Sequence, residues 1–459
     1  MMKVPLHLLS DNFIKTKHIT EETPYTIKEI DARLLLCANR LDLAAKIAYI
    51  EARENNADME FVRELYKKHI EAFSEGYFIE PGDEDKTSIE QFFLTFDQLI
   101  DDYKMNGFDA QESLIPIGKN NVILDGAHRT ACAIYFGGNV SVIEFPQFEV
   151  SFNYSYFRTR RLSEEMLEYM ALVYSRYAVT PLYMACLWPA AQQSKRSVAL
   201  KRITTEHNIV LDTSVVLNNR GLRNFMIQVY QNQDWIGTVE NHFSGVLGKV
   251  DECFTPGCTT EVILFENGTL EDVLSMKEDI RKIFQLGKHA IHISDSNEET
   301  KLMASLLYNE NSRHALNYGK PDMYPERFYE MEFYKGTNTN WDMNATLAYY
   351  GIMDVGKVEV NDSMVDAFNP RSYFIYNGMK FPAFSYVKRI KKSLDGEAGK
   401  KIDKLMKAVN RNERKRKIED LKTSEIWRIR KMELYCKQIA MHVTKKIGVY
   451  DMIYKLRHR

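Results

Sequence analysis

The chain of 459 residues has few cysteines and lacks a long apolar run. Of its six cysteines only Cys253 and Cys258 stand close together, and neither has a neighbouring His or Cys pair of zinc-site spacing. We therefore expect free thiols in a reducing cytoplasm. No window approaches the roughly 18 apolar residues of a membrane span, and the start, MMKVPLHLLSDNF, lacks a secretory pattern. These absences predict a cytoplasmic location.

The chain also lacks a strong net charge, yet its charges are unevenly distributed. The total is −2, from 61 Lys and Arg against 63 Asp and Glu. From Lys388 onward there are 23 Lys and Arg against 9 Asp and Glu, or +14, which leaves 38 against 54, or −16, for the rest. Such a basic amphipathic tail can contact nucleic acid, an anionic membrane surface or the acidic body of its own protein. We favour docking on the body.

The composition is that of a globular protein, with 45% hydrophobic and 27% charged residues. The length predicts about two or three domains. We expect a multidomain α/β (α+β) fold whose parts are a helical N-terminal lead (1–75), a small module (76–150), a helical connector (151–204), an α/β domain (205–400) and the basic helical tail (401–459).

Periodicity predicts the individual elements. Apolar residues at three- and four-residue spacing predict helices through 26–75 and 160–190, and one helix over SIEQFFLTFDQLIDDYKMNGF that ends at Gly107. Short apolar runs predict strands: SLIPI, VILDG and NVSVIEF in the module, then HNIVLDTSVVL, TTEVILFE and HAIHIS, and a strand-turn at RSYFIYNGMKF.

The segment VILDGAHRTACAIYF contains a candidate phosphate site, which we call the DGAHR turn (residues 125–129). Gly126 permits a sharp turn and a close approach of ligand to backbone. The helix that follows begins with unpaired N–H groups and the positive end of its dipole. His128 and Arg129 lie in its first turn and can face the same anion, with Thr130 beside them. This arrangement suits a nucleotide phosphate; alternatively Asp125 is only an N-cap and the two cationic residues lie on the surface.

The DGAHR turn and its flanks resemble the ParB/sulfiredoxin superfamily. The matching residues are Leu99-Ile100, Asn106-Gly107-Phe108, Ile115-Pro116-Ile117, Asp125-Gly126-Ala127-His128-Arg129, Ala131 and Ala133. In that superfamily the turn cradles a nucleotide phosphate. The resemblance therefore implies ATP or CTP, with Mg²⁺, as the ligand of residues 76–150.

Departures from the superfamily narrow the expected function. Sulfiredoxins carry a reactive cysteine where Ala127 stands here, and Cys132 lies three residues past Arg129, so sulfinic-acid repair is not expected. Partition proteins have Gly-Glu-Arg-Arg at the turn and a helix-turn-helix after it, whereas the Tyr-rich NYSYFRTRRL follows here. What remains is similar to the kinase-like branch. The overall layout resembles proteins that accompany bacterial surface-polysaccharide enzymes.

A phosphotransferase acting on a small hydroxyl or sugar-like acceptor needs a carboxylate to orient or deprotonate that hydroxyl. Glu80, in the acidic loop GYFIEPGDEDK, is the candidate base, and Asp125 and His128 are further catalytic candidates. Lys86 can reach the phosphate; the alternative is that the loop is merely a solvated acidic turn. Two other functions stay open: a ParB-type DNA-binding or nucleotide-switched regulator, and a non-catalytic nucleotide-binding scaffold.

A second group of titratable residues lies in KHAIHISDSNEET (288–300). The second-site candidates there are His289, His292, Asp295 and Glu298. At the end of a strand they can bind a divalent metal or perform acid–base chemistry. Two overlapping capping boxes, Asp295-x-x-Glu298 and Ser296-x-x-Glu299, explain the acids equally well but not the histidines.

Two weaker patterns occur in the second half. A further anion site is suggested by Lys249, Glu266, Lys277 and Arg281, since a spacing of four places the last two on one helix face; solvated helix charges give the same pattern. YYGIMDVGKVEV faintly resembles nucleotidyltransferase-like proteins, but Lys357-Val358-Glu359 replaces their metal-binding Asp-x-Asp.

Overall fold

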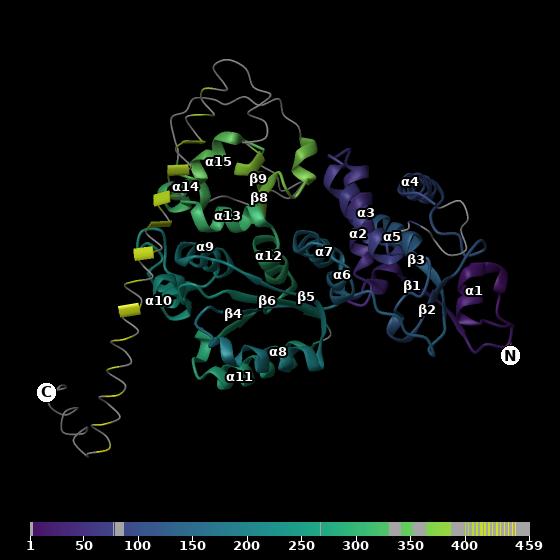
Figure 1. Ribbon diagram of the computed structural model, residues 1–459, viewed down its shortest axis with the longest axis horizontal. Helices are drawn as coiled ribbons and strands as arrows, with labels where there is room; N and C mark the ends of the chain where they lie inside the picture. The colour runs from purple at the N-terminus through teal and green to yellow at the C-terminus, as the bar shows by residue number, and fades with distance from the viewer. Residues whose placement is uncertain are drawn as a thin grey trace.

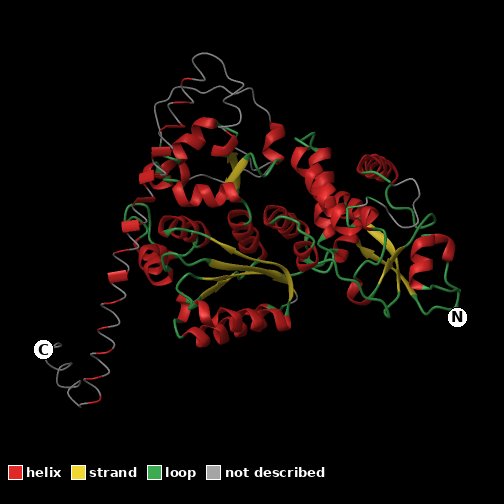
Figure 2. Cartoon of the chain, viewed as in Figure 1, coloured by secondary structure: helices red, strands yellow, loops and turns green. Residues whose placement is uncertain are grey.

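The computed structural model describes residues 3–76, 78, 87–266, 268–329, 341–351 and 364–386, with single positions between 400 and 446. Figure 1 shows a small sheet with its helices beside a larger sheet covered on both faces, and a third, mainly helical group above the larger sheet. Helices predominate over strands (Figure 2), and the predicted mixed α/β class is confirmed. Among the described helices, none combines the length and apolar character needed to traverse a bilayer.

The small sheet has the strand order β1-β3-β2. β1 (Thr26–Asp31) runs antiparallel to β3 (Asn139–Glu144), and β2 (Ile115–Ile117) runs parallel to β3. The prediction of helices from residue 26 is therefore wrong at β1. Its two isoleucines stand three residues apart, as in a helix, but pairing with β3 along its whole length decides the strand. Residues 26–31, which were expected to belong to the helical N-terminal lead, thus form one strand of the small sheet.

The helices around this sheet agree better with prediction. They are α1 (Asp11–Lys17), α2 (Asp42–Glu54), α3 (Glu60–Ser74), α4 (Ile89–Asn106) and α5 (Ala127–Phe136). Ser88 and Gln91 form a capping box at the start of α4, which ends at Gly107 with φ 73°. The expected strand VILDG is wrong: only Ile123 forms a bridge, to Ile117, because the chain then bends into the turn.

The larger sheet has the order β5-β6-β4-β7 with antiparallel neighbours throughout. Its elements are β4 (Leu182–Leu187), α8 (Gln193–Glu206), β5 (Asn208–Val215), β6 (Thr260–Glu266), α11 (Leu270–Phe284) and β7 (Ile291–Ile293). Helix α8 connects β4 to β5, and α11 connects β6 to β7, so this is the β-α-β-β-α-β arrangement of ferredoxin-like sheets. An insertion between β5 and β6 contains α9 (Asn219–Val229) and α10 (Ser244–Cys253).

The strand β4 corrects the prediction of helix through residues 160–190. The helices α6 (Tyr154–Thr159) and α7 (Glu164–Tyr177) do form, but residues 182–187 are a strand buried along its whole length. A strand covered on both faces is a continuous apolar run, and periodicity alone cannot distinguish it from a buried helix. The expected helical connector therefore supplies a central strand.

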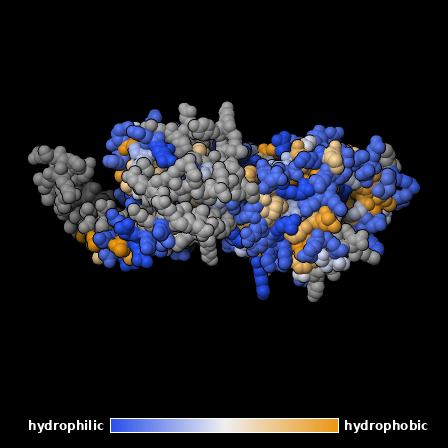
Figure 3. All heavy atoms as spheres, turned by 90° about the horizontal axis from the view of Figure 1, so that it is seen from above, coloured by the Kyte–Doolittle hydropathy of each residue, from blue (hydrophilic) through white to orange (hydrophobic). Residues whose placement is uncertain are grey.

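A continuous core joins the two sheets. One face of the larger sheet, including Ala185 and Ile263, packs on α8 and α11. The other face, including Met184 and Val262, belongs to a cluster that extends through α7, α9 and α12 (Asn297–Leu307) into α2, α3 and α5. From outside, most of the described surface in Figure 3 is hydrophilic, with scattered apolar patches.

The third group contains α13 (Glu310–Tyr318), α14 (Pro325–Phe328), α15 (Met343–Tyr349), β8 (Tyr373–Tyr376) and β9 (Met379–Pro382). The predicted strand-turn is confirmed, with Asn377 and Gly378 at φ 49° and 74° between the strands. In the tail, Met406 packs on this group, whereas Ile418 and Leu421 are exposed. The sequence KVEV at 357–360 lies outside the described residues.

A buried cluster of charged side chains lies behind the DGAHR turn. Arg40 donates two hydrogen bonds of 2.8 Å to Asp42 and another to the carbonyl of Ile123. Lys46 donates to Asp42 at 3.0 Å and lies 3.2 Å from Nε2 of His69. All four side chains are buried. Burial opposes ionisation of Asp42, but Arg40 and Lys46 outweigh it and hold the pKa of Asp42 well below its usual range.

We predict that Asp42→Asn lowers the free energy of unfolding by about 3–5 kcal/mol, because it leaves buried cations without their counter-charge. Since the folded pKa is lowered, the contribution of Asp42 is present above about pH 4 and is lost as pH falls further. Urea denaturation at several pH values measures both effects. Asp31→Asn, at an exposed pair with Arg33, is the control and should change little; equal losses in both variants would contradict the prediction.

Candidate functional site

The backbone of the DGAHR turn places an uncapped helix N-terminus at the surface of the small sheet. Gly126 has φ 78° and ψ 29°, in the left-handed region that favours glycine, and is the N-cap of α5. The Asp125 carboxylate accepts hydrogen bonds from Ser10 Oγ at 2.6 Å and from Gly126 N at 2.7 Å. Asp125 is therefore not the N-cap, and no N-cap side chain satisfies the first N–H groups of α5.

His128 and Thr130 are held by the protein itself. Nε2 of His128 lies 2.8 Å from the hydroxyl of Tyr66, and its ring stands edge-on to Phe96 at 4.7 Å between centroids. Thr130 is buried and donates its hydroxyl proton to the carbonyl of Gly126 at 3.0 Å. Its backbone N–H donates to the same carbonyl, so both donors of Thr130 are engaged within the turn, and a role of Thr130 in phosphate binding stays a prediction.

Arg129 is the cation that the turn presents. Its guanidinium folds over Gly126, so that Nη2 would lie 3.0 Å from a Cβ atom at that position. Burial lowers the pKa of Arg129 while the nearby Asp125 opposes the shift, and the guanidinium stays charged. Within the described ranges no carboxylate forms an ion pair with it. Ala127 begins α5 and packs against the core, whereas Glu80 and Lys86 lie outside the described residues.

The Mg²⁺ implied by the resemblance stays a prediction. In the described part of the turn the carboxylate is that of Asp125, and each of its oxygens accepts one hydrogen bond. Over the described positions, no group of three or more His, Cys, Asp and Glu side chains is arranged to hold a metal ion. We therefore derive no chemical step through a metal.

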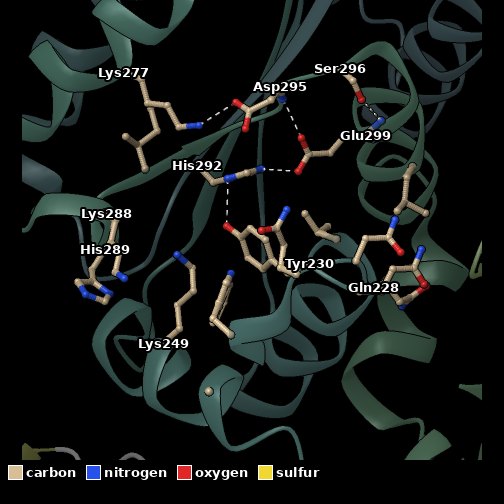
Figure 4. Close-up of a pocket in the computed structure, with 18 of the residues that line it drawn as sticks. Gln228, Tyr230, Lys249, Lys277, Lys288, His289, His292, Asp295, Ser296 and Glu299 are labelled. Carbon is tan, nitrogen blue, oxygen red and sulfur yellow. Dashed lines mark hydrogen bonds and ion pairs between the residues drawn. The ribbon is translucent and has the colours of Figure 1, made fainter. Parts of the chain in front are cut away.

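The second-half candidates meet at a cavity of about 710 Å³ (Figure 4). Its walls come from the ends of α9 and α11, from α10, from β7 and from the start of α12. The sequence-predicted residues that line it are His289, His292, Asp295, Glu298, Lys249, Lys277 and Arg281. Glu266 is buried elsewhere and accepts hydrogen bonds from Tyr174 and from Ala38 N. The volume is typical of a small-molecule site.

His292 lies in the cavity wall with both ring nitrogens engaged. Nε2 lies 2.9 Å from Oε1 of Glu299, and Nδ1 lies 3.0 Å from the hydroxyl of Tyr230. Burial lowers the pKa of His292, although Glu299 opposes the shift. In the neutral ring Nε2–H donates to Glu299 and Nδ1 accepts from Tyr230. Both ring nitrogens of His292 thus have partners within the protein, and its role as a metal ligand or base stays a prediction.

The acids of this region cap α12. Ser296 Oγ accepts from Glu299 N at 3.1 Å, and the Glu299 carboxylate accepts from Asp295 N at 2.7 Å. The capping by Ser296 and Glu299 is confirmed, with the return bond one residue earlier than in a standard box. Because Ser296 is the N-cap, the alternative box from Asp295 does not form. Asp295 instead accepts from Lys277 at 3.1 Å, and Glu298 is exposed.

Two lysines, Lys249 and Lys288, lie on the opposite side of the cavity together with His289 (Figure 4). Burial is the main cause that lowers the pKa of His289, so its ring adds no charge at neutral pH. Nζ of Lys249 lies 5.1 Å from the ring centre of Tyr230 and 5.6 Å from that of Trp235. Burial is the main cause that lowers the pKa of Lys249, and the charge of Lys288 adds to it. Sequence reasoning missed the two aromatic residues, because they lie in the insertion, about 60 residues upstream of the histidines.

Neither a protein-family model, nor a curated protein, nor a solved structure matches the chain. The likeness of the DGAHR turn to the ParB/sulfiredoxin superfamily thus remains an interpretation of its residues. The geometry of the two sites has to support any assignment of function.

The lowered pKa of His292 predicts a pH dependence of stability. The unfolded state takes up protons below about pH 6.5 more readily than the folded state, so stability is present above that pH and is lost as pH falls. We expect His292→Gln to flatten the slope of unfolding free energy between pH 7 and 5 by at most about 1.4 kcal/mol per pH unit. Chemical denaturation measures the slope. His7→Gln, at an exposed position, should leave it unchanged; identical slopes in wild type and His292→Gln would refute the idea.

Proposed function

We propose that residues 76–150, with β1 completing their sheet, are a ParB/sulfiredoxin-like module that binds ATP or CTP at the DGAHR turn. The chain would then be a cytoplasmic, kinase-like phosphotransferase that acts on a small hydroxyl or sugar-like acceptor in bacterial surface-polysaccharide biosynthesis. The observation that supports this most is Arg129, which lies beside the uncapped N-terminus of α5 and has no carboxylate ion-pair partner among the described residues.

The contacts of the turn suit a fixed phosphate cradle. The left-handed conformation of Gly126 and the bond from its N–H to Asp125 set the direction in which α5 begins. Tyr66 and Phe96 hold the ring of His128 in the first helical turn. A phosphate there would receive backbone N–H donors, the favourable end of the helix dipole and the guanidinium fork of Arg129. Charge-assisted hydrogen bonds of this kind contribute about 1.5–3 kcal/mol each.

Two carboxylates are candidates for the base that deprotonates the hydroxyl of the acceptor. Asp125 is part of the turn, but its oxygens are engaged by Ser10 and Gly126. Glu80, which lies outside the described residues, is the other. Loss of turnover with retained nucleotide binding in Glu80→Gln, but not in Asp125→Asn, would assign the role to Glu80.

We expect Arg129→Ala to weaken nucleotide affinity roughly 10- to 100-fold and to abolish turnover, because it removes charge-assisted bonds to the phosphate. Arg129→Lys keeps the charge without the planar fork and should be intermediate. Thermal shift and titration calorimetry with ATP, ADP, CTP and GTP, with and without MgCl₂, provide the measurement. Arg33→Ala, at a surface pair with Asp31, is the matched control.

The outcomes separate the competing functions. If none of the nucleotides shifts the melting temperature of the wild type, the proposal fails. Binding without turnover on any acceptor would favour the non-catalytic scaffold. Salt-sensitive DNA binding that is lost when residues 401–459 are removed would favour the regulator.

A further inference from the structure

The polar side chains that line the cavity between α10 and α11 are of two kinds. Some have hydrogen-bond or ion-pair partners in the described structure, and others have none or only some of their atoms engaged. Both nitrogens of His292 and both oxygens of Glu299 are engaged. Lys277 is buried and donates to the carbonyl of Ile293 at 2.8 Å and to Asp295. These side chains form the wall of the cavity. Their polar atoms have partners within the protein.

The cations around the cavity remain only partly compensated. In the described structure neither Lys249 nor Lys288 forms an ion pair with a carboxylate, although both line the cavity. Arg281 bonds Glu278, but its buried Nε has no hydrogen-bond partner. Burial is the largest cause that lowers the pKa of Lys249, and the positive charges of Lys288 and Arg281 lower it further. Mutual repulsion among cations around an open volume is relieved when an anion binds between them.

The remaining lining has the character of a sugar or nucleoside site. Trp235 is 43% exposed and stands edge-on to Tyr230 at 5.1 Å between ring centroids. An exposed aromatic face in a cavity can stack on a ring. Figure 4 shows Gln228, Ser296 and Glu299 on the side away from Lys288. Gln228 and Glu299 already have partners within the protein. The hydroxyl of Ser296, which accepts from Glu299 N, can still donate its proton to a hydroxyl of a ligand.

We propose that this cavity binds a small organic phosphate, with the phosphate between Lys249, Arg281 and Lys288 and the hydroxyl-bearing ring toward Trp235. A phosphate dianion requires more positive charge than a single carboxylate, and lysine ammonium groups are common phosphate ligands. The site is independent of the nucleotide proposed at the DGAHR turn. In Figure 1 α5 and α10 lie in opposite halves of the molecule, so no group passes directly from one site to the other.

Charge removal tests the site on the full chain. Titration calorimetry uses inorganic pyrophosphate, uridine monophosphate and citrate as probes. We expect the two phosphates to bind, and Lys249→Ala and Lys288→Ala each to weaken them roughly 10- to 100-fold. Lys282→Ala is the control, because Lys282 lies on α11 outside the cavity lining and pairs with Asp279. An equal loss in the control would show general surface attraction and overturn the proposal.

Filling the cavity tests it without removing a charge. A Cβ atom at Gly248, which lines the cavity on α10, would meet no other atom within 4 Å. Gly248→Ala should therefore fold and keep the affinity, whereas Gly248→Phe should occupy the cavity and lower it at least tenfold with an unchanged circular dichroism spectrum. Retained binding in folded Gly248→Phe would place the ligand elsewhere and refute the proposal.

Two further outcomes keep this site distinct from the turn. Arg129→Ala should leave phosphate binding in the cavity unchanged, so a failure of nucleotide binding at the turn does not affect this test. If citrate binds as tightly as pyrophosphate, the cavity does not prefer phosphate over carboxylate, and the proposal that its ligand is a phosphate fails. If no probe binds to the wild type at all, the cavity is not an anion site.

Discussion

The ionised pair between Arg40 and Asp42 is the interaction on which the N-terminal half depends. Asp42 is completely buried, and its charge is tolerated only because Arg40 and Lys46 surround it. Arg40 also holds the carbonyl of Ile123, two residues before the DGAHR turn. In the other direction Lys46 contacts His69, whose Nδ1 contacts the carbonyl of Tyr66. The buried charged cluster thus contacts the residues that precede the DGAHR turn and, through His69, the residue that holds His128.

This cluster extends to the site itself through Tyr66. The hydroxyl of that residue contacts His128 in the first turn of α5, and its ring packs on Phe96 at 5.4 Å. A displacement at Asp42 would reach both ends of the turn, through Ile123 on one side and His128 on the other. Buried charged networks of this kind are costly to leave half satisfied. Loss of Asp42 would therefore disturb the geometry of the turn as well as the stability of the fold.

The two candidate sites share one physical feature, which is positive charge without a carboxylate partner in the described structure. Nearby carboxylates are engaged in both places: Asp125 by Ser10 and a backbone N–H, and Glu299 by His292 and a backbone N–H. The sites differ in how they are built. The turn takes its donors from one short segment, whereas the cavity combines the insertion before β6 with the segment from α11 to α12.

The sequence by itself determined the local features. Ser88 and Gly107 delimit α4, Asn377 and Gly378 make the hairpin turn, and Gly126 bends the chain at the start of α5, because capping and positive φ depend on a few adjacent residues. Only the tertiary structure decided that residues 26–31 and 182–187 are strands, since partners far along the chain set their pairing. It also placed Tyr230 and Glu299 against the two ring nitrogens of His292. Spacing in a sequence shows which side chains can meet locally; which of them are already bonded depends on packing.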